Sequence, residues 1–192
     1  MINQSFNAQP PRASAGFKPA LTRIPSRIQY EKVVIVTRET ELESLTAKFN
    51  TIEQARFYLE HAGQSFAPIE KVHARYQDTL KQLRGIIPRG VKSQVISRQL
   101  VPQFTFGEHD IVITIGQDGL VVNTAKYLTH QPIIAINPDP ESIEGVLLPF
   151  DKQKGLPDLK SILSGQSVVK KITMANAAMN DGQQLLAFND FF

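Results

Sequence analysis

The chain has 192 residues, of which 42% are hydrophobic and 20% charged, and it contains no cysteine. This composition is that of an ordinary globular domain, which excludes a wholly disordered chain, a disulfide framework and cysteine-based metal sites. The four histidines, at positions 61, 73, 109 and 130, are never three or four residues apart, so we expect no metal ion held by the protein. The lack of cysteine also fits a reducing compartment, and we expect a cytoplasmic location.

The positive charge is concentrated in the first 30 residues. The formal net charge is +3, and residues 1–30 contain four of the 21 basic residues and none of the 18 acidic ones. Subtracting those four leaves 17 basic against 18 acidic residues, a charge of about −1 that offers no electrostatic footprint for nucleic acid. Four of the 12 prolines also lie in this segment, which predicts a flexible basic arm over residues 1–30.

Residues 31–150 alternate between short apolar runs and helical patterns. Strands are predicted over residues 32–37, 92–97, 110–115 and 132–137. Helices are predicted between them, over residues 41–49, 52–62, 65–84 and 120–128. Thr51 and Gln54 are spaced as a capping box that would start one of these helices. Strands separated by helices predict an α/β domain over 31–150, built on a doubly wound, mostly parallel sheet. All of the apolar runs are far shorter than the roughly 20 residues of a membrane span, so we expect no membrane partner.

The pattern changes after residue 150. A polar connection over residues 151–154 precedes a short predicted helix over 156–163 and a predicted strand over 168–177. Asn180-Asp181-Gly182 is a strong hairpin signal that leads into a return strand over 183–188. We therefore expect residues 151–192 to comprise a linker and the first hairpin of an antiparallel β domain that is cut short at residue 192.

One predicted strand ends in a turn bracketed by glycines, Gly116-Gln117-Asp118-Gly119, which opens a helix. Ligands of open α/β sheets bind at the carboxyl ends of the strands. Gly116 would let the backbone approach a ligand, and Gly119 would leave the first helical turn bare, so that its N–H groups could face an anion. Asp118 adds a carboxylate, either with Mg²⁺ between it and a phosphate or facing a sugar hydroxyl. The structural alternative is that Asp118 caps the helix and the glycines only make a tight connection.

The order of three motifs resembles that of the ATP-NAD kinase family. They are the strand and turn over residues 110–128, the strand end at Asn137 within 132–138, and the segment 181–190. The family places a GGDG turn, an Asn at a strand end and an Asn-Asp or Asn-Glu pair in the same order. The resemblance covers residues 31–192.

The resemblance implies an enzyme that phosphorylates the 2′-hydroxyl of NAD with ATP, or a related phosphoryl donor, to give NADP. Mg²⁺ would be held mainly by the nucleotide phosphates. The resemblance also implies a homo-oligomer, a dimer or a tetramer, whose partners are small-molecule nucleotides. The site residues that it implies are the catalytic Asp118 and the nucleotide-binding residues Gly116, Gly119, Asn137, Asn189 and Asp190.

Two positions depart from the family pattern, and they leave alternatives open. Gln117 stands where the family has a second glycine, and Leu120 stands where it has Thr or Ser. One alternative is a non-catalytic nucleotide-binding or regulatory module of the same fold, in which Gln117 abolishes turnover. Another is a lipid or sugar kinase relative, because related kinase families share the turn.

Overall fold

The computed structural model describes residues 21–23, 30–166 and 168–188. The predicted arm over residues 1–30 therefore lies outside the described residues except for 21–23 and 30. Asn189 and Asp190 also lie outside them. Throughout the described ranges, no helix combines the length and the apolar character needed to cross a bilayer.

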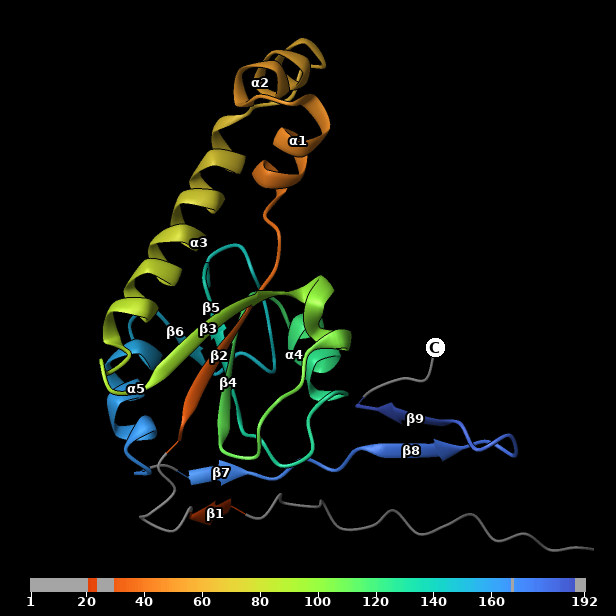
Figure 1. Cartoon of the computed structure of the whole chain (residues 1–192). Coiled ribbons are helices and arrows are strands. Elements are labelled where there is room, and N and C mark those ends of the chain that lie inside the picture. Colours follow the sequence, from red (N-terminus) through yellow and green to blue (C-terminus); the bar gives the residue numbers. More distant parts are fainter. Residues whose placement is uncertain (1–20, 24–29, 167, 189–192) are drawn as a thin grey trace, which may run out of the picture.

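A five-stranded parallel sheet forms the centre of the fold (Figure 1). Its strand order is β3-β2-β4-β5-β6. The strands are β2 (Lys32–Thr37), β3 (Lys92–Ser97), β4 (Asp110–Ile115), β5 (Ile133–Asn137) and β6 (Phe150–Asp151). The α/β class, the doubly wound parallel sheet and the four predicted strands are confirmed, and β6 is an additional short strand at one edge.

The central strands are buried on both faces, as their continuous apolar runs predict. Every residue of β4 is buried, and its alternate residues contribute to two different clusters. Ile111, Ile113 and Ile115 pack with Tyr76 and other residues of the larger cluster, whereas Val112 packs in a second cluster on the other face. The sheet therefore needs helices on both sides.

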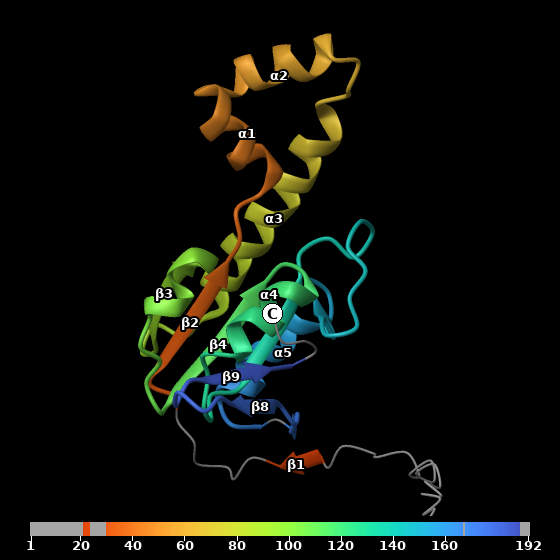
Figure 2. The ribbon, with the colours of Figure 1, turned by 90° about the vertical axis from the view of Figure 1, so that its right-hand side faces the viewer.

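Helices cover the two faces of the sheet (Figures 1 and 2). The helix α3 (Ala67–Ile86) and the helix α5 (Gly155–Leu163) contribute to the larger cluster. The 3₁₀ helix η1 (Arg98–Gln103) and the helix α4 (Asp118–Ala125) contribute to the second. Because α5 packs on the main sheet through Leu156, Leu159 and Leu163, residues 151–163 belong to the α/β unit and extend it beyond the predicted boundary at residue 150.

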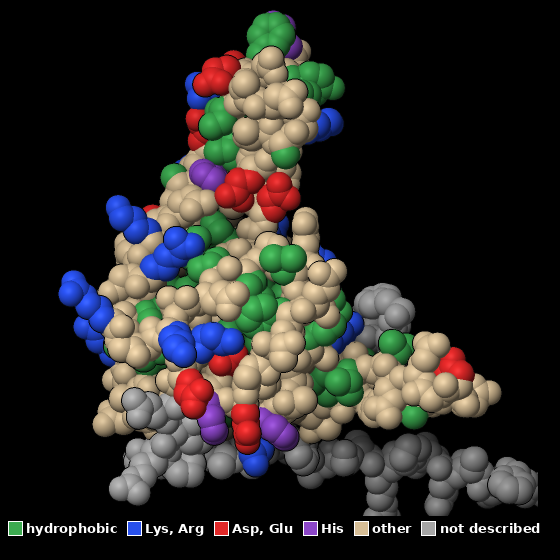
Figure 3. Space-filling model, in the orientation of Figure 1, with side chains coloured by type: hydrophobic (Ala, Val, Ile, Leu, Met, Phe, Trp, Pro, Cys, Tyr) green, Lys and Arg blue, Asp and Glu red, His purple; other side chains and the backbone are tan. Residues whose placement is uncertain are grey.

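The helices α1 (Glu41–Phe49) and α2 (Ile52–His61) form, with the first turns of α3, a projection that we call the helical tip (Figures 1 and 2). It has a small core of its own, made of the buried residues Leu42, Ala55, Leu59 and Phe66. Thr40 forms a complete capping box with Glu43, while Thr51 forms only one of its two predicted bonds, accepting from the Gln54 N–H. Hydrophobic side chains also lie on its surface (Figure 3), namely Ile52, Phe57 and Tyr58.

The strand predicted over residues 168–177 is wrong as a single strand. The structure divides it into β7 (Val168–Lys170) and β8 (Ala175–Ala178), which belong to different sheets. β7 pairs antiparallel with β1 (Leu21–Arg23), so that part of the predicted arm is a strand. β8 pairs antiparallel with β9 (Gln184–Ala187), and the predicted hairpin is confirmed.

Candidate functional site

A crevice lies at the carboxyl ends of β2 and β3, beside the start of α4. The chain leaves β2 to form β3 on one side of β2 and later returns to form β4 on the other side, so the carboxyl ends of β2 and β4 form a topological switch point. The crevice has a volume of about 870 Å³. Its lining includes Thr37, Arg38, Glu39, Ser97, Arg98 and Gln117. Its position is the one at which open α/β sheets bind ligands.

The buried Tyr76 of α3 lines this crevice and forms hydrogen bonds with the chain on both sides of it. Its hydroxyl accepts a hydrogen bond from the Arg38 backbone N–H at 3.0 Å and donates one to the Ile115 carbonyl at 3.3 Å. Burial raises the pKa of Tyr76 to about 12, because the ionised phenolate would be poorly solvated there. One side chain therefore ties the ends of β2 and β4 to the helix that packs over them.

Two guanidinium groups, those of Arg38 and Arg98, lie in the lining of the crevice. Among the described residues, neither forms a salt bridge with a carboxylate. Of the two acidic side chains in the lining, Glu43 is engaged by the Thr40 backbone N–H at 2.8 Å and the Gln77 amide at 3.0 Å. The crevice lining therefore holds two guanidinium groups that could bind an anionic group, beside the carboxylates of Glu39 and Glu43.

The glycine turn adjoins this crevice, and its two glycines have different environments. Gly116 has a φ of +156°, and a Cβ there would lie 3.0 Å from Arg38 Cδ and 3.2 Å from Leu120 Cδ2. A Cβ at Gly119 would meet nothing within 4 Å. The helix α4 begins with Gln117 as N-cap, and the Gln117 side chain makes no capping hydrogen bond. The backbone conformation at 116 therefore favours a glycine, while the space at 119 is open.

Asp118 points toward the loop that follows β5. Its Oδ2 accepts the Val146 backbone N–H at 2.9 Å, and its Oδ1 accepts the Leu147 backbone N–H at 3.0 Å. Asp118 is the first residue of α4 and not its N-cap, so the predicted capping role is wrong. The crevice lining contains Gln117 and not Asp118. The structure thus places the candidate catalytic carboxylate next to the crevice, bound to a neighbouring loop.

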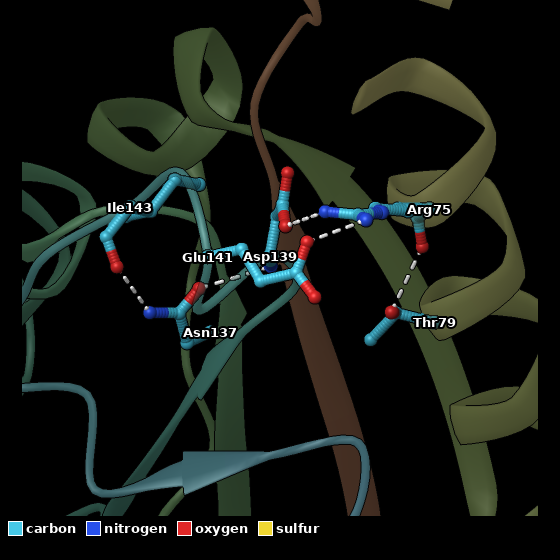
Figure 4. Close-up of polar contacts among 6 residues, drawn as sticks. All are labelled: Arg75, Thr79, Asn137, Asp139, Glu141 and Ile143. Atoms are coloured by element: carbon cyan, nitrogen blue, oxygen red, sulfur yellow. Dashed lines mark hydrogen bonds and ion pairs between the residues drawn. The ribbon is translucent and has the colours of Figure 1, made fainter. Parts of the chain in front are cut away.

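Asn137 is buried, and its amide organises the same loop (Figure 4). Its Nδ2 donates to the Ile143 carbonyl at 2.8 Å, and its Oδ1 accepts the Asp139 backbone N–H at 3.0 Å. Both ends of the amide are therefore used within the protein. Asn137 and Asp118 anchor one loop from two sides.

Three charged residues that the sequence analysis did not single out meet beside this loop (Figure 4). Arg75 Nη1 lies 2.5 Å from Asp139 Oδ1, and Arg75 Nη2 lies 2.7 Å from Glu141 Oε2. The hydrogen bond to Glu141, followed by that to Asp139, raises the pKa of Arg75. No spacing rule could have found this cluster, because Arg75 and Asp139 are 64 residues apart in the sequence.

Within residues 21–23, 30–166 and 168–188, no group of three or more His, Cys, Asp or Glu side chains is arranged to hold a metal ion. The comparison with protein-family models finds none that matches this chain, and the search of curated proteins finds no significant match.

Proposed function

We propose that this protein binds nucleotide phosphates in the crevice and transfers a phosphoryl group from ATP, or a related donor, to the 2′-hydroxyl of NAD, giving NADP. One observation carries the proposal. At the switch point of a parallel sheet, Arg38, Arg98 and the N-cap residue of α4 line a single hollow of about 870 Å³. The motif order that resembles ATP-NAD kinases supports the choice of reaction.

The residues of this edge suit the chemistry. Guanidinium groups bind phosphate oxygens in pairs, and the N–H groups at the start of a helix attract the same anions. Mg²⁺ would enter with the phosphates and neutralise charge that develops on them. In the reaction the 2′-oxygen forms a bond to the transferred phosphorus, the bond from that phosphorus to the donor's bridging oxygen breaks, and Asp118 takes the hydroxyl proton. Each Asp118 oxygen accepts one N–H and keeps capacity for a second hydrogen bond.

A second candidate function is a non-catalytic nucleotide-binding module. The observation that favours it is that Asp118 is bound to Val146 and Leu147 and does not line the crevice. In such a module Asp118 would only fix the loop, and nucleotides would bind without turnover.

Calorimetric titration with Mg²⁺-ATP and with NAD, followed by an assay for NADP on the same sample, separates the two functions. We expect both binding and turnover. Asp118→Asn should abolish turnover and keep the affinity for ATP. The double variant Arg38→Gln/Arg98→Gln should weaken ATP binding by about tenfold or more, because two charge-assisted hydrogen bonds are lost. Arg89→Gln, which changes an exposed arginine outside the crevice, is the matched control.

The outcomes are distinct. Binding without NADP formation favours the module, and binding of neither nucleotide overturns both functions. Equal turnover by Asp118→Asn and the unchanged protein would remove Asp118 from the mechanism while leaving the crevice as the binding site.

A further inference from the structure

The loop over residues 138–149, which connects β5 to β6 and which we call the strap, is fixed at three points. The first is Asn137, whose amide bonds to the Ile143 carbonyl and the Asp139 N–H. The second is Arg75 of α3, which binds two carboxylates of the strap. The third is Asp118 of α4, which accepts two consecutive backbone N–H groups of the strap. A loop this long would otherwise have many conformations, so these contacts define its position.

The contact with Arg75 is the one on which the buried part of the strap depends. The Asp139 side chain is only 2% exposed, and its Oδ2 is buried without a hydrogen-bond partner among the described residues. Arg75 is the cation that compensates the desolvation of this carboxylate (Figure 4). Removing one partner of such a pair leaves an uncompensated buried charge, which is far more costly than the loss of an exposed ion pair. Without Arg75, the strap would move to let Asp139 reach water.

The contact with Asp118 requires the strap to come very close. A Cβ at Gly145 would lie 2.7 Å from Asp118 Oδ1 and 2.6 Å from Leu148 Cδ1, distances that no real side chain adopts. Glycine at this position therefore allows the backbone N–H groups of Val146 and Leu147 to reach the carboxylate. Because one N–H binds each oxygen, the two bonds fix the orientation of the carboxylate plane.

We propose that Arg75 is a positioning residue for Asp118 and acts through the strap. Its ion pairs with Asp139 and Glu141 fix the strap on α3, and the strap in turn holds the Asp118 carboxylate in one orientation through two N–H groups. The link between Arg75 and Asp118 can be measured whether or not the protein is an enzyme. Its consequence for catalysis rests on the proposed function.

The first experiment measures this link by hydrogen exchange of the Val146 and Leu147 amides and by the carboxyl carbon NMR signal of Asp118. In Arg75→Leu, we expect both amides to exchange about tenfold faster or more and the Asp118 signal to move toward that of a solvated carboxylate. Arg75→Lys, which keeps one cation, should recover part of the protection. Arg84→Leu, an exposed arginine of the same helix, is the matched control and should change neither signal.

A second variant tests the link from its other end, in case Arg75→Leu does not fold. Gly145→Ala should raise exchange at both amides, because the added methyl group separates the strap from Asp118. Asp118→Ala, which removes both acceptor oxygens, should do the same, and adding Arg75→Leu to it should give no further increase, since both act on one contact. Unchanged exchange in Arg75→Leu, or fully additive effects in the double variant, would overturn the inference.

The activity assay then separates this inference from the proposed function. In Arg75→Leu, we expect the kcat for NADP formation to fall about tenfold while the KM for NAD stays within about twofold, because orientation and not binding is lost. If Arg75→Leu speeds exchange of the Val146 and Leu147 amides but the unchanged protein forms no NADP, the proposed function is overturned and the control of Asp118 by Arg75 is supported. A protein that turns over normally in Arg75→Leu, with unaltered amides, overturns the inference alone.

Discussion

The two glycines of the Gly116-Gln117-Asp118-Gly119 turn should respond to alanine in opposite directions. At Gly116, the φ of +156° is one that residues with a side chain rarely adopt, and the new Cβ would lie 3.0 Å from Arg38 Cδ. Backbone strain of this kind costs about 1–3 kcal/mol. At Gly119, which is helical and has free space around it, alanine should stabilise the fold by about 0.4–1 kcal/mol, because it reduces the freedom of the unfolded chain.

Urea denaturation of the two variants and the unchanged protein measures this contrast directly. A chain of this size shifts its Tm by about 2–4 °C per kcal/mol, so thermal melting gives a second readout. We expect Gly116→Ala to unfold at lower urea concentration and Gly119→Ala at equal or higher concentration, with the same slope m. A Gly116→Ala variant as stable as the unchanged protein would refute the strained turn. A destabilised Gly119→Ala would refute the open space at the start of α4.

Three further predictions concern Tyr76, Leu83 and the alkaline limit of stability. Tyr76→Phe removes the hydroxyl that joins Arg38 and Ile115, and denaturant titration should show a loss of about 1–2 kcal/mol. The pKa of Tyr76 is raised to about 12 from its ordinary value of 10.0, so above pH 10 the unfolded chain loses a proton that the folded one keeps. The free energy of unfolding should then fall by about 1.4 kcal/mol per pH unit up to pH 12. Tyr76→Phe should reduce this slope, and an unchanged slope in that variant contradicts the assignment of the titration to Tyr76. Leu83→Ala, in a residue that is 0% exposed, should cost about 2–5 kcal/mol, whereas Lys81→Ala on the exposed side of α3 should cost less than about 0.5 kcal/mol by the same titration.

The sequence predicts the central sheet well because burial on both faces leaves a direct signature. The continuous apolar runs at 32–37 and 110–115 are the strands β2 and β4, with the same bounds. Elements defined by a distant partner are predicted poorly. The strand expected over 168–177 is divided because Val168–Lys170 pairs with Leu21–Arg23, a pairing that no local pattern encodes.

The candidate site divides in the same way. The position of the glycine turn at the end of β4 follows from local sequence, and the structure has α4 starting there. The residues that bind Asp118 could not be predicted from local sequence. Val146 and Leu147 bind it through backbone N–H groups, which every residue but proline possesses. The Asn137 side chain is a predicted nucleotide contact, and its hydrogen bonds within the folded chain are made with Asp139 and Ile143. Long-range contacts of this kind become visible only in the folded chain.

The separate small core of the helical tip has an evolutionary consequence. Leu42, Ala55, Leu59 and Phe66 pack with one another and share no member with the clusters of the sheet. Substitutions at the outward-facing positions of α2, such as Phe57 and Tyr58, therefore change what the projection presents to its surroundings without loosening the edge where Arg38 and Tyr76 meet. This part of the molecule can therefore vary at its surface while the packing of the sheet stays the same.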